Sequence, residues 1–345
     1  MPKHAFKDFK IAGPLLANIM KAGLSAPTPI QDEIIPHILL KRDVIGLANT
    51  GTGKTAAFLI PLIHLTLREN HRRTLILTPT RELALQIEQE LKKLSAGMRM
   101  YSTVCVGGAD IRPQIRSLSR PNHFVIGTPG RTLDLINRGV FKPAGVTTVV
   151  LDEADRMLDM GFIHDIRKIL SGVPSMRETL FFSATMSREI ESLIATFAKN
   201  PATVSVKKKD TTDNIAQDVV RCEGKDKFVV LTDLLRQSGY TRVLVFGAMK
   251  HGVERLRKRL DAEGIAAESI HGNKSHSQRQ RALARFKTQE VRVLVATDVA
   301  ARGLHIDHVS HVINYDLPQT YEDYIHRIGR TGRGKERGKA LSFVE

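Results

Sequence analysis

Short apolar runs rich in β-branched residues alternate with longer segments of helical period along the whole chain. TLILTP (74–79) is typical of the runs, and RELALQIEQELKKL (81–94) is typical of the segments between them. Continuous apolar strands separated by helices indicate parallel sheets that are covered on both faces. The two groups of runs predict an α/β fold of two domains, each a mostly parallel sheet with helices on both faces. The other expected strands lie at 43–48, 102–107, 123–128, 147–152 and 179–184, and then at 242–247, 266–271, 291–297, 311–316 and 339–344.

The expected boundary between the two groups is the segment SVKKKDTTDNIA at 205–216. It is polar and charged and has no hydrophobic periodicity, as expected of a short linker. We therefore predict an N-terminal domain at 1–204 and a C-terminal domain at 217–345, and a length of 345 residues is ordinary for two domains. The chain stops directly after its last predicted strand, so it stays open whether a C-terminal extension is missing.

The net charge indicates an anionic partner. The chain carries 52 Lys and Arg against 36 Asp and Glu, a formal charge of +16. The excess is even, because residues 1–200 contribute 26 − 18 = +8 and the remaining residues contribute the same 26 − 18 = +8. Such a balance favours nucleic acid or an anionic membrane face, although solvated Lys and Arg faces alone also produce it.

Composition also indicates where the protein works. A hydrophobic content of 42% is enough for packed cores and excludes wholesale disorder. The stretch at 56–67 is too short and interrupted to span a bilayer, and the first ten residues lack the apolar region of a secretory signal. Cys105 and Cys222 form no disulfide framework and show no metal-ligand spacing, which suits a reducing compartment. We expect a cytoplasmic protein without a membrane span.

The segment from Ala48 to Thr55 reads ANTGTGKT and lies between an apolar strand and an apolar-periodic helix. This is the context of a phosphate-binding loop, whose glycines let main-chain N–H groups surround a β-phosphate. Ala48 stands where the usual GxxxxGKT has its first glycine. We expect Lys54 to reach the β- and γ-oxygens and Thr55 to place its hydroxyl on Mg²⁺. The candidate nucleotide-binding residues of the loop are Thr50, Gly51, Thr52, Gly53, Lys54 and Thr55.

LDEAD at 151–155 follows another apolar strand, at the end where open α/β sheets place their ligand sites. Asp152 is the expected second ligand of Mg²⁺, and Glu153 is the expected general base that polarises the attacking water. An acidic helix start is the alternative, since carboxylates favour helix N-termini. Together with Lys54 and Thr55, the pair predicts hydrolysis of ATP or GTP.

With LDEAD in place, the chain resembles the DEAD-box family of ATP-dependent RNA helicases over nearly its whole length. The motifs stand in family order, and the ordered set is far more specific than any one tripeptide. The short core and HGNKS (271–275) look most like the bacterial RhlE-like subgroup. The matching residues are Phe6, Gly23, Pro27, Ile30, Gln31, 48–55, PTREL (79–83), GG (107–108), TPGR (128–131), DEAD (152–155), SAT (183–185), VF (245–246), TD (297–298), ARG (301–303) and HRIGRTGR (326–333).

The resemblance implies two RecA-like domains joined by a short linker, with ATP bound in the cleft between them. The amide of Gln31 offers a donor and an acceptor, which suits adenine. Arg330 and Arg333 are implied as arginine fingers on the γ-phosphate, with His326 in the same network. Leu24 replaces a usual aromatic, and Asp307 is displaced from the usual ribose-binding acid. The remaining implied residues are Phe6 and Gly303 for ATP, and Ser183, Thr185 and Asp155 for coupling the two domains.

For RNA, the resemblance implies contacts to the backbone rather than to base edges, because the residues are hydroxyls, guanidiniums and close-approach glycines. Binding is then expected to depend on salt and hardly on sequence. His276 stands where the family usually has a Gln. The implied RNA-binding residues are Thr80, Arg81, Gly108, Thr128, Arg131, His276, Arg279 and Thr297.

We predict an RNA-dependent ATPase that uses ATP and Mg²⁺ to close two domains on RNA and to unwind short RNA duplexes or remodel RNA–protein complexes. It is expected to be a monomer, with protein partners in ribosome assembly or RNA decay. An ATP-gated RNA clamp and a DNA-directed translocase remain the alternatives. The biological RNA cannot be named from the sequence.

Overall fold

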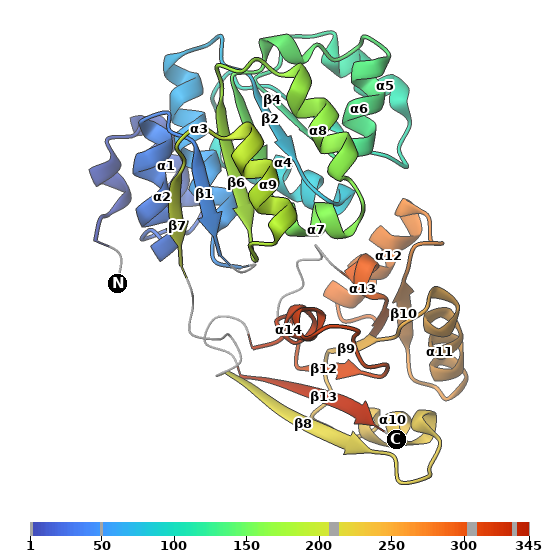
Figure 1. The fold of residues 1–345 in the computed structure, drawn as a ribbon. Coiled ribbons are helices and arrows are strands. Elements are labelled where there is room, and N and C mark those ends of the chain that lie inside the picture. The colour runs from blue at the N-terminus through green and yellow to red at the C-terminus, as the bar shows by residue number, and fades with distance from the viewer. Residues whose placement is uncertain (1–2, 49–50, 207–213, 302–308, 333–336, 345) are drawn as a thin grey trace. The chain divides into compact units, whose positions relative to one another are not determined.

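The structure is a computed structural model that describes residues 3–48, 51–206, 214–301, 309–332 and 337–344, except for the side chains of His276, Val299 and Glu322. The chain divides into two compact units, residues 1–208 and 209–345, and each is built on its own sheet (Figure 1). Neighbouring strands are parallel in both sheets. The predicted α/β class with two mostly parallel sheets is confirmed.

The first sheet has seven strands among the described residues, in the order β3-β4-β2-β5-β6-β1-β7. Its central strands are short and fully buried, which explains their continuous apolar sequences. The strands are β1 (Val44–Leu47), β2 (Thr74–Leu77), β3 (Ser102–Cys105), β4 (Phe124–Gly127), β5 (Thr148–Leu151), β6 (Glu178–Ser183) and β7 (Ala202–Ser205).

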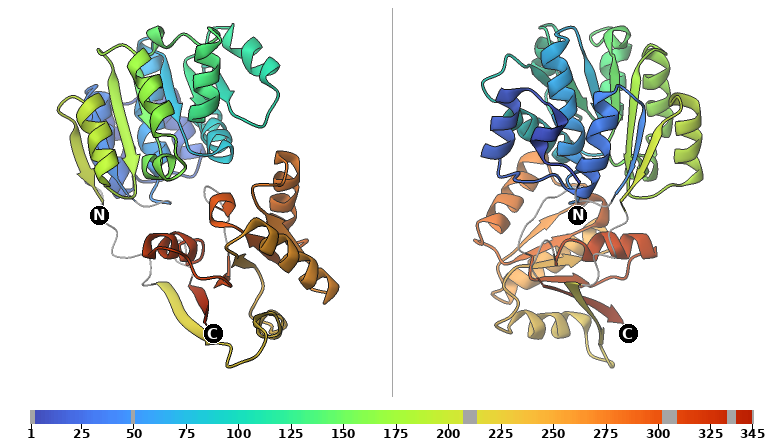
Figure 2. Two further views of the ribbon diagram at one scale, coloured as in Figure 1. Left: turned by 45° about the vertical axis from the view of Figure 1, so that its right-hand side comes forward. Right: turned by 90° about the vertical axis from the view of Figure 1, so that its left-hand side faces the viewer.

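Helices cover both faces of this sheet, as the two views in Figure 2 show. Successive strand residues point to opposite faces, so Val150 joins one buried cluster while Val149 and Leu151 join the other. The first cluster includes α1 (Gly13–Lys21), α2 (Pro29–Leu39), α3 (Lys54–Arg68) and α4 (Arg81–Leu94). The second includes α5 (Ile111–Leu118), α6 (Pro129–Asn137), α7 (Ala154–Asp159), α8 (Ile163–Gly172) and α9 (Arg188–Phe197), and two short 3₁₀ helices lie at Phe6–Phe9 and Pro143–Gly145.

The second sheet has six strands among the described residues, in the order β10-β11-β9-β12-β13-β8. Val243 and Val245 pack toward α10 and α11, while Leu244 and Phe246 pack on the other face with α12. The elements are β8 (Ile215–Arg221), α10 (Lys227–Leu235), β9 (Val243–Phe246), α11 (Lys250–Ala262), β10 (Ala267–Ile270), α12 (His276–Lys287), β11 (Val293–Ala296), α13 (Asp298–Ala301), β12 (His311–Asn314), α14 (Tyr321–Ile328) and β13 (Gly338–Val344).

Two strands, β7 and β8, were not predicted. Both are edge strands, and their exposed positions are polar or mixed, so neither has a continuous apolar run. The structure thus has Ser205, Ile215 and Ala216 in strands, whereas the sequence analysis assigned these residues to the linker. Residues 207–213 of that segment are outside the described ranges, and the exact domain boundaries stay a prediction.

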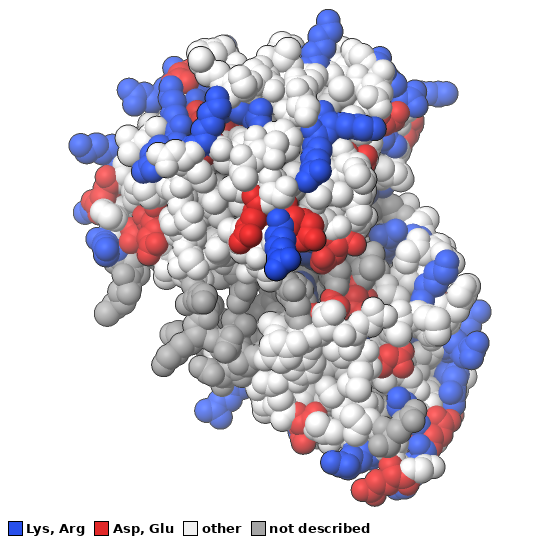
Figure 3. All heavy atoms as spheres, in the orientation of Figure 1, with Lys and Arg blue, Asp and Glu red and all other residues white. Residues whose placement is uncertain are grey.

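None of the helices in the described part of the chain is long and apolar enough to cross a membrane. Lys and Arg side chains are spread over both units on the face drawn in Figure 3, with acidic side chains between them. The surface therefore agrees with the even charge distribution expected from the sequence.

Candidate functional site

The predicted site residues of the first unit follow the carboxyl ends of its strands. They therefore lie along one edge of the sheet, the edge formed by these strand ends. The phosphate loop follows β1, the DEAD segment follows β5, and Ser183 ends β6 between them. The predicted RNA-binding residues follow β2, β3 and β4, which are also adjacent. Ligands of open α/β sheets bind outside this edge. The strand order therefore separates the residues predicted for the nucleotide from those predicted for RNA along this edge.

The phosphate loop is held by the buried side chain of Gln31 on α2. Its Nε2 donates to the Gly53 carbonyl oxygen (3.1 Å), and its Oε1 accepts from the Thr28 N–H (2.9 Å). Gly53 has φ 90°, and a Cβ there would lie 2.5 Å from Gln31 Nε2. The loop thus requires glycine at this position. The Gln31 amide has a second hydrogen and a second lone pair beyond these two bonds, and its contact with adenine stays a prediction.

The N-terminal segment before α2 is held by hydrogen bonds to Asp32, the residue after Gln31. Its carboxylate accepts from the main-chain N–H of Lys3 (2.6 Å) and His4 (3.2 Å) and lies 2.8 Å from His4 Nδ1. Burial raises the pKa of Asp32, but these hydrogen bonds outweigh it and the net pKa is lowered. The contact places Phe6 in the core, 6.3 Å from Phe9 in an edge-on arrangement, while Leu24 is half-buried against the same core.

The DEAD segment buries three carboxylates beside Lys54. Asp152 is 2% exposed and Glu153 is 4% exposed. Burial raises the pKa of Asp152 to about 7, although the Lys54 charge opposes the shift. Glu153 occupies the left-handed region with φ 54° at the start of α7, and its Oε2 accepts from Arg156 Nη1 within a buried ion pair. Glu153, the general base predicted from the sequence, is therefore paired with Arg156 in this structure.

Asp155 joins the DEAD segment to the residues that follow β6. Its Oδ2 accepts from the main-chain N–H groups of Ala184 (2.9 Å) and Thr185 (3.1 Å), and the Thr185 hydroxyl lies 3.4 Å away. The hydroxyl of Ser183 is buried and has no hydrogen-bond partner among the described residues. Asp155 and Thr185 thus lie in contact next to Ser183, and their role in coupling the two domains stays a prediction.

The donors that would hold Mg²⁺ are hard oxygens, which suits this ion. Thr55 is half-buried in the first turn of α3, and Asp152 is a carboxylate enclosed near the loop and Lys54. A cation would compensate the cost of ionising Asp152 in this buried place. The residues present therefore fit a magnesium ion that supports a bound triphosphate.

The predicted RNA-binding residues of the first unit also lie near one another. Arg131 Nη1 and Nη2 donate to the Ala109 carbonyl oxygen (3.3 and 3.4 Å), so α6 is held against the loop after β3. Gly108 in that loop has φ 69°, and a Cβ there would lie 3.8 Å from Arg81 Nη1. Thr80 and Thr128 begin α4 and α6 as N-cap residues. The five predicted RNA-binding residues of this unit thus share one end of the sheet.

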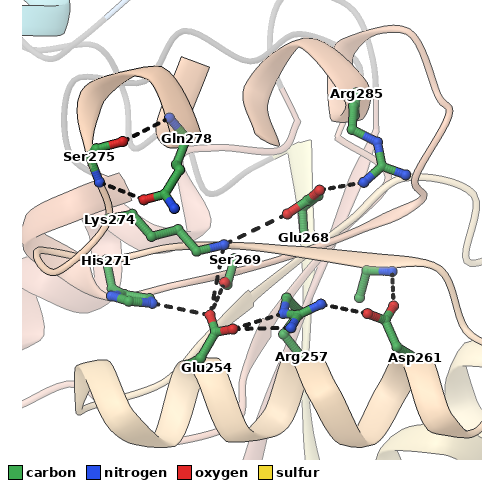
Figure 4. A network of polar contacts seen from close by, with 11 residues as sticks. Glu254, Arg257, Asp261, Glu268, Ser269, His271, Lys274, Ser275, Gln278 and Arg285 are labelled. Carbon is green, nitrogen blue, oxygen red and sulfur yellow. Dashed lines mark hydrogen bonds and ion pairs between the residues drawn. The ribbon is translucent and has the colours of Figure 1, made fainter. Parts of the chain in front are cut away.

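In the second unit, a polar network fixes the turn between β10 and α12 (Figure 4). Glu254 on α11 accepts from Ser269 Oγ (2.6 Å), lies 3.2 Å from His271 Nε2 and lies 3.7 Å from Lys274 Nζ. Burial raises the pKa of Glu254, but these contacts outweigh it and lower the pKa to about 2. Arg279 Nε donates to the Lys274 carbonyl oxygen (3.1 Å). The network therefore positions Arg279, a predicted RNA-binding residue.

The HRIGRTGR segment is anchored by Arg327, which is 2% exposed. Its guanidinium forms a two-pronged pair with Asp298 (2.6 and 2.7 Å) and lies over the Phe246 ring. His326 is half-buried and Arg330 is buried, and both line a small hollow together with Asp298. Thr297 precedes Asp298 and is buried.

Several predicted residues cannot be placed. Thr50, Gly303, Asp307 and Arg333 lie outside the described residues, as does the side chain of His276. Conversely, the sequence analysis assigned no role to Arg156. Its spacing of three residues from Glu153 on a helix was the available signal.

Comparison with known proteins gives the family. The family model "DEAD/DEAH box helicase" matches residues 28–193, and "Helicase conserved C-terminal domain" matches residues 226–335. The DEAD-box ATP-dependent RNA helicase CshA of Geobacillus kaustophilus is 46% identical over 98% of this chain and 73% of its own length. CshA of Listeria monocytogenes is 46% identical over 99% of this chain, which spans 66% of that relative. The narrower RhlE-like assignment stays a prediction.

Solved structures agree with these relatives. A DEAD box protein from Methanococcus jannaschii is 40% identical, with a TM-score of 0.58 over 99% of this chain and 93% of its own. Dbp5 of S. cerevisiae bound to RNA and ADP BeF3 is 31% identical, with a TM-score of 0.86 over 99% of this chain and 89% of its own. Both sheets therefore have the RecA-like fold expected from the motifs. The chain belongs to the DEAD-box family of ATP-dependent RNA helicases.

Proposed function

We propose that this protein is an RNA-dependent ATPase, whose two units close on RNA when ATP binds and which unwinds short RNA duplexes or remodels RNA–protein complexes. The observation that carries the proposal is the shared sheet edge, where the phosphate loop, the DEAD segment and Ser183–Thr185 follow three adjacent strands. Dbp5, which has the same fold, is bound to RNA and a nucleotide complex in its structure.

In this proposal, Lys54 binds the β- and γ-phosphates. Thr55 and Asp152 would hold Mg²⁺, which would neutralise phosphate charge. Glu153 takes the proton of the attacking water at a carboxylate oxygen. Gln31 orients the adenine, and Arg330 and Arg333 stabilise charge on the γ-phosphate. The burial of Lys54, Asp152 and Glu153 supports the roles proposed for these three residues.

The RNA-binding residues of both units follow strand ends and offer hydroxyls, guanidiniums and glycine main chain. We propose that they bind phosphates and 2′-hydroxyls, so affinity falls with salt and varies little with sequence. We further propose that the protein acts in the cytoplasm as a monomer, with partners in ribosome assembly or RNA decay.

The test compares ATP turnover with a short RNA duplex, with the matching DNA duplex and with buffer alone. RNA should raise turnover strongly and DNA should not, and strand separation should require ATP. Glu153→Gln should abolish turnover while ATP and RNA still bind. The proposal fails if RNA raises turnover no more than buffer does. Retention of RNA without strand separation would instead indicate an ATP-gated clamp.

A further inference from the structure

The strand β3 leaves one side of the first sheet open. It is one of the two edge strands of this sheet, and among the described strands it pairs only with β4. The carbonyl oxygens of Tyr101 and Cys105 accept from N–H groups of the β4 side. Main-chain groups of alternate residues in a strand point to opposite neighbours, so those of Ser102 and Val104 point away from β4. An open strand edge of this kind can pair with a further strand.

Val106 is the next residue whose main-chain groups point away from β4, and its bonds show which kind of partner such groups take. Val106 donates its N–H to Gln114 Oε1 (3.1 Å), and its carbonyl oxygen accepts from Gln114 Nε2 (3.1 Å). The Gln114 amide on α5 thus satisfies Val106 as a neighbouring strand would. No such partner covers Ser102 and Val104 among the described residues.

A hollow of about 520 Å³ lies at the first residues of β3, Ser102 and Thr103, and is also lined by residues of α4 and α5. We call it the β3 hollow. Leu91 and Met100 give it apolar walls, and Ser102, Thr103 and Ser117 give it hydroxyl groups. Thr103 Oγ1 and Ser117 Oγ already bond to each other (2.8 Å). The hollow therefore combines a main-chain edge with apolar side-chain contacts, as extended peptides require.

The aromatic side chain of Tyr101, directly before β3, is exposed and held in place by its neighbours. Tyr101 is 54% exposed, and its ring stacks on His123 with centroids 5.8 Å apart and planes 15° apart. The Tyr101 N–H donates to His123 Nδ1 (3.2 Å), while His123 Nε2 lies 3.0 Å from Asn70 Oδ1. Both His123 nitrogens are thus bonded, Nδ1 to the Tyr101 main chain and Nε2 to Asn70. Preorganised tyrosines of this kind are frequent anchors in protein interfaces.

The charges of the β3 hollow favour an acidic occupant. Lys92 is 65% exposed on its rim, and Arg120 is also exposed. Glu88 is the acidic lining residue, and it is already paired with Lys92 (3.0 Å) and bonded by Ser102 Oγ (3.2 Å). The net charge of the lining is positive, so carboxylates of a partner would find complementary groups.

We propose that the β3 hollow is a docking site for an extended acidic peptide segment of a partner protein, which adds as a strand to β3. The hollow lies at the amino end of β3 and reaches residues that precede the strand, whereas the nucleotide and RNA residues follow the carboxyl ends of the strands. A partner bound here leaves the ATP and RNA residues of this unit accessible. The proposal does not depend on the proposed catalytic function.

The test uses three dye-labelled peptides with the full chain: SEVEVEVS, the basic version SKVKVKVS, and SEVEPEVS, in which proline removes one main-chain N–H donor. Fluorescence anisotropy should show binding of the first peptide at micromolar concentrations and at least tenfold weaker binding of the other two. NMR amide exchange should slow at Ser102 and Val104 and stay unchanged in the other edge strand, β7.

Variants locate the site. Arg120→Glu combined with Lys92→Gln should weaken binding of the acidic peptide at least tenfold, whereas Lys142→Glu, at an exposed lysine outside the hollow, should not. RNA-stimulated ATP turnover, measured in the same samples, should be equal in all three proteins. Equal affinity for acidic and basic peptides, or unchanged exchange at Ser102 and Val104, would overturn the proposal. Displacement of the acidic peptide by poly(U) would also overturn it, since the surface would then be an RNA site.

Discussion

Arg156 forms a buried ion pair with Glu153, the candidate general base, three residues before it on α7. Both side chains are almost completely buried, so neither charge is compensated by water. Arg156 therefore holds the candidate general base, although it was not among the residues predicted from the sequence.

Replacing Arg156 by Gln should leave Glu153 buried without its partner. Removing one member of a buried pair costs about 3–5 kcal/mol, so the free energy of unfolding should fall by an amount in this range. Urea denaturation measures the change. Arg138→Gln is the control, because Arg138 forms an exposed pair with Asp134 and should cost about 0.3–0.5 kcal/mol. Equal losses in the two variants would show that the Arg156 pair contributes no more than a surface pair.

The pKa of Asp152 predicts a pH dependence of stability without nucleotide. The folded value is about 7 and the unfolded value is about 3.9, so between these values the folded state binds the extra proton. The free energy of unfolding should therefore fall as the pH rises from about 4 to 7 and level off above this range. Asp152→Asn should remove this slope and be more stable than the native chain at pH 8. Urea denaturation at pH 5 and pH 8 tests this, and parallel curves for the two proteins would contradict it.

Gly53→Ala should damage the phosphate loop in two separable ways. The added Cβ meets Gln31 Nε2 at 2.5 Å, and φ 90° is unfavourable for alanine. ATP affinity should fall at least tenfold. In the double variant with Gln31→Ala the contact is removed while the strained φ remains, so only part of the cost of Gly53→Ala should disappear. A thermodynamic cycle of four proteins, measured by ATP binding, gives the coupling. Strict additivity would show that Gln31 does not crowd residue 53.

Glu254→Gln should weaken RNA binding through the turn that carries Arg279. The amide keeps the size of the side chain but loses the charge that holds Lys274 and His271. We expect the RNA concentration for half-maximal ATP turnover to rise about tenfold, or about 1.4 kcal/mol, with little change in maximal turnover. Glu263→Gln, which affects an exposed pair with Arg236, is the control. A fall in maximal turnover at unchanged RNA affinity would show that Glu254 does not act through the turn.

The central strands could be predicted from the sequence because burial on both faces imposes continuous apolar runs, as in β2 and β5. The edge strands β7 and β8 could not, because exposed residues carry no such constraint. In the site, Lys54, Asp152 and Glu153 could be predicted because each stands in a short motif that follows an apolar strand. The bond from Gln31 to Gly53 joins residues 22 apart, and no local pattern encodes such a contact.

The last main-chain bond between β5 and β2 has a further consequence. Asp152 donates its N–H to the Leu77 carbonyl oxygen (3.0 Å), just where β2 leads toward Thr80 and Arg81. The residues predicted for the nucleotide and those predicted for RNA are therefore joined here by a main-chain hydrogen bond. Among the side-chain types, only proline at position 152 would remove this N–H donor, so other substitutions on either side of the bond leave the donor and the acceptor between the two strands in place.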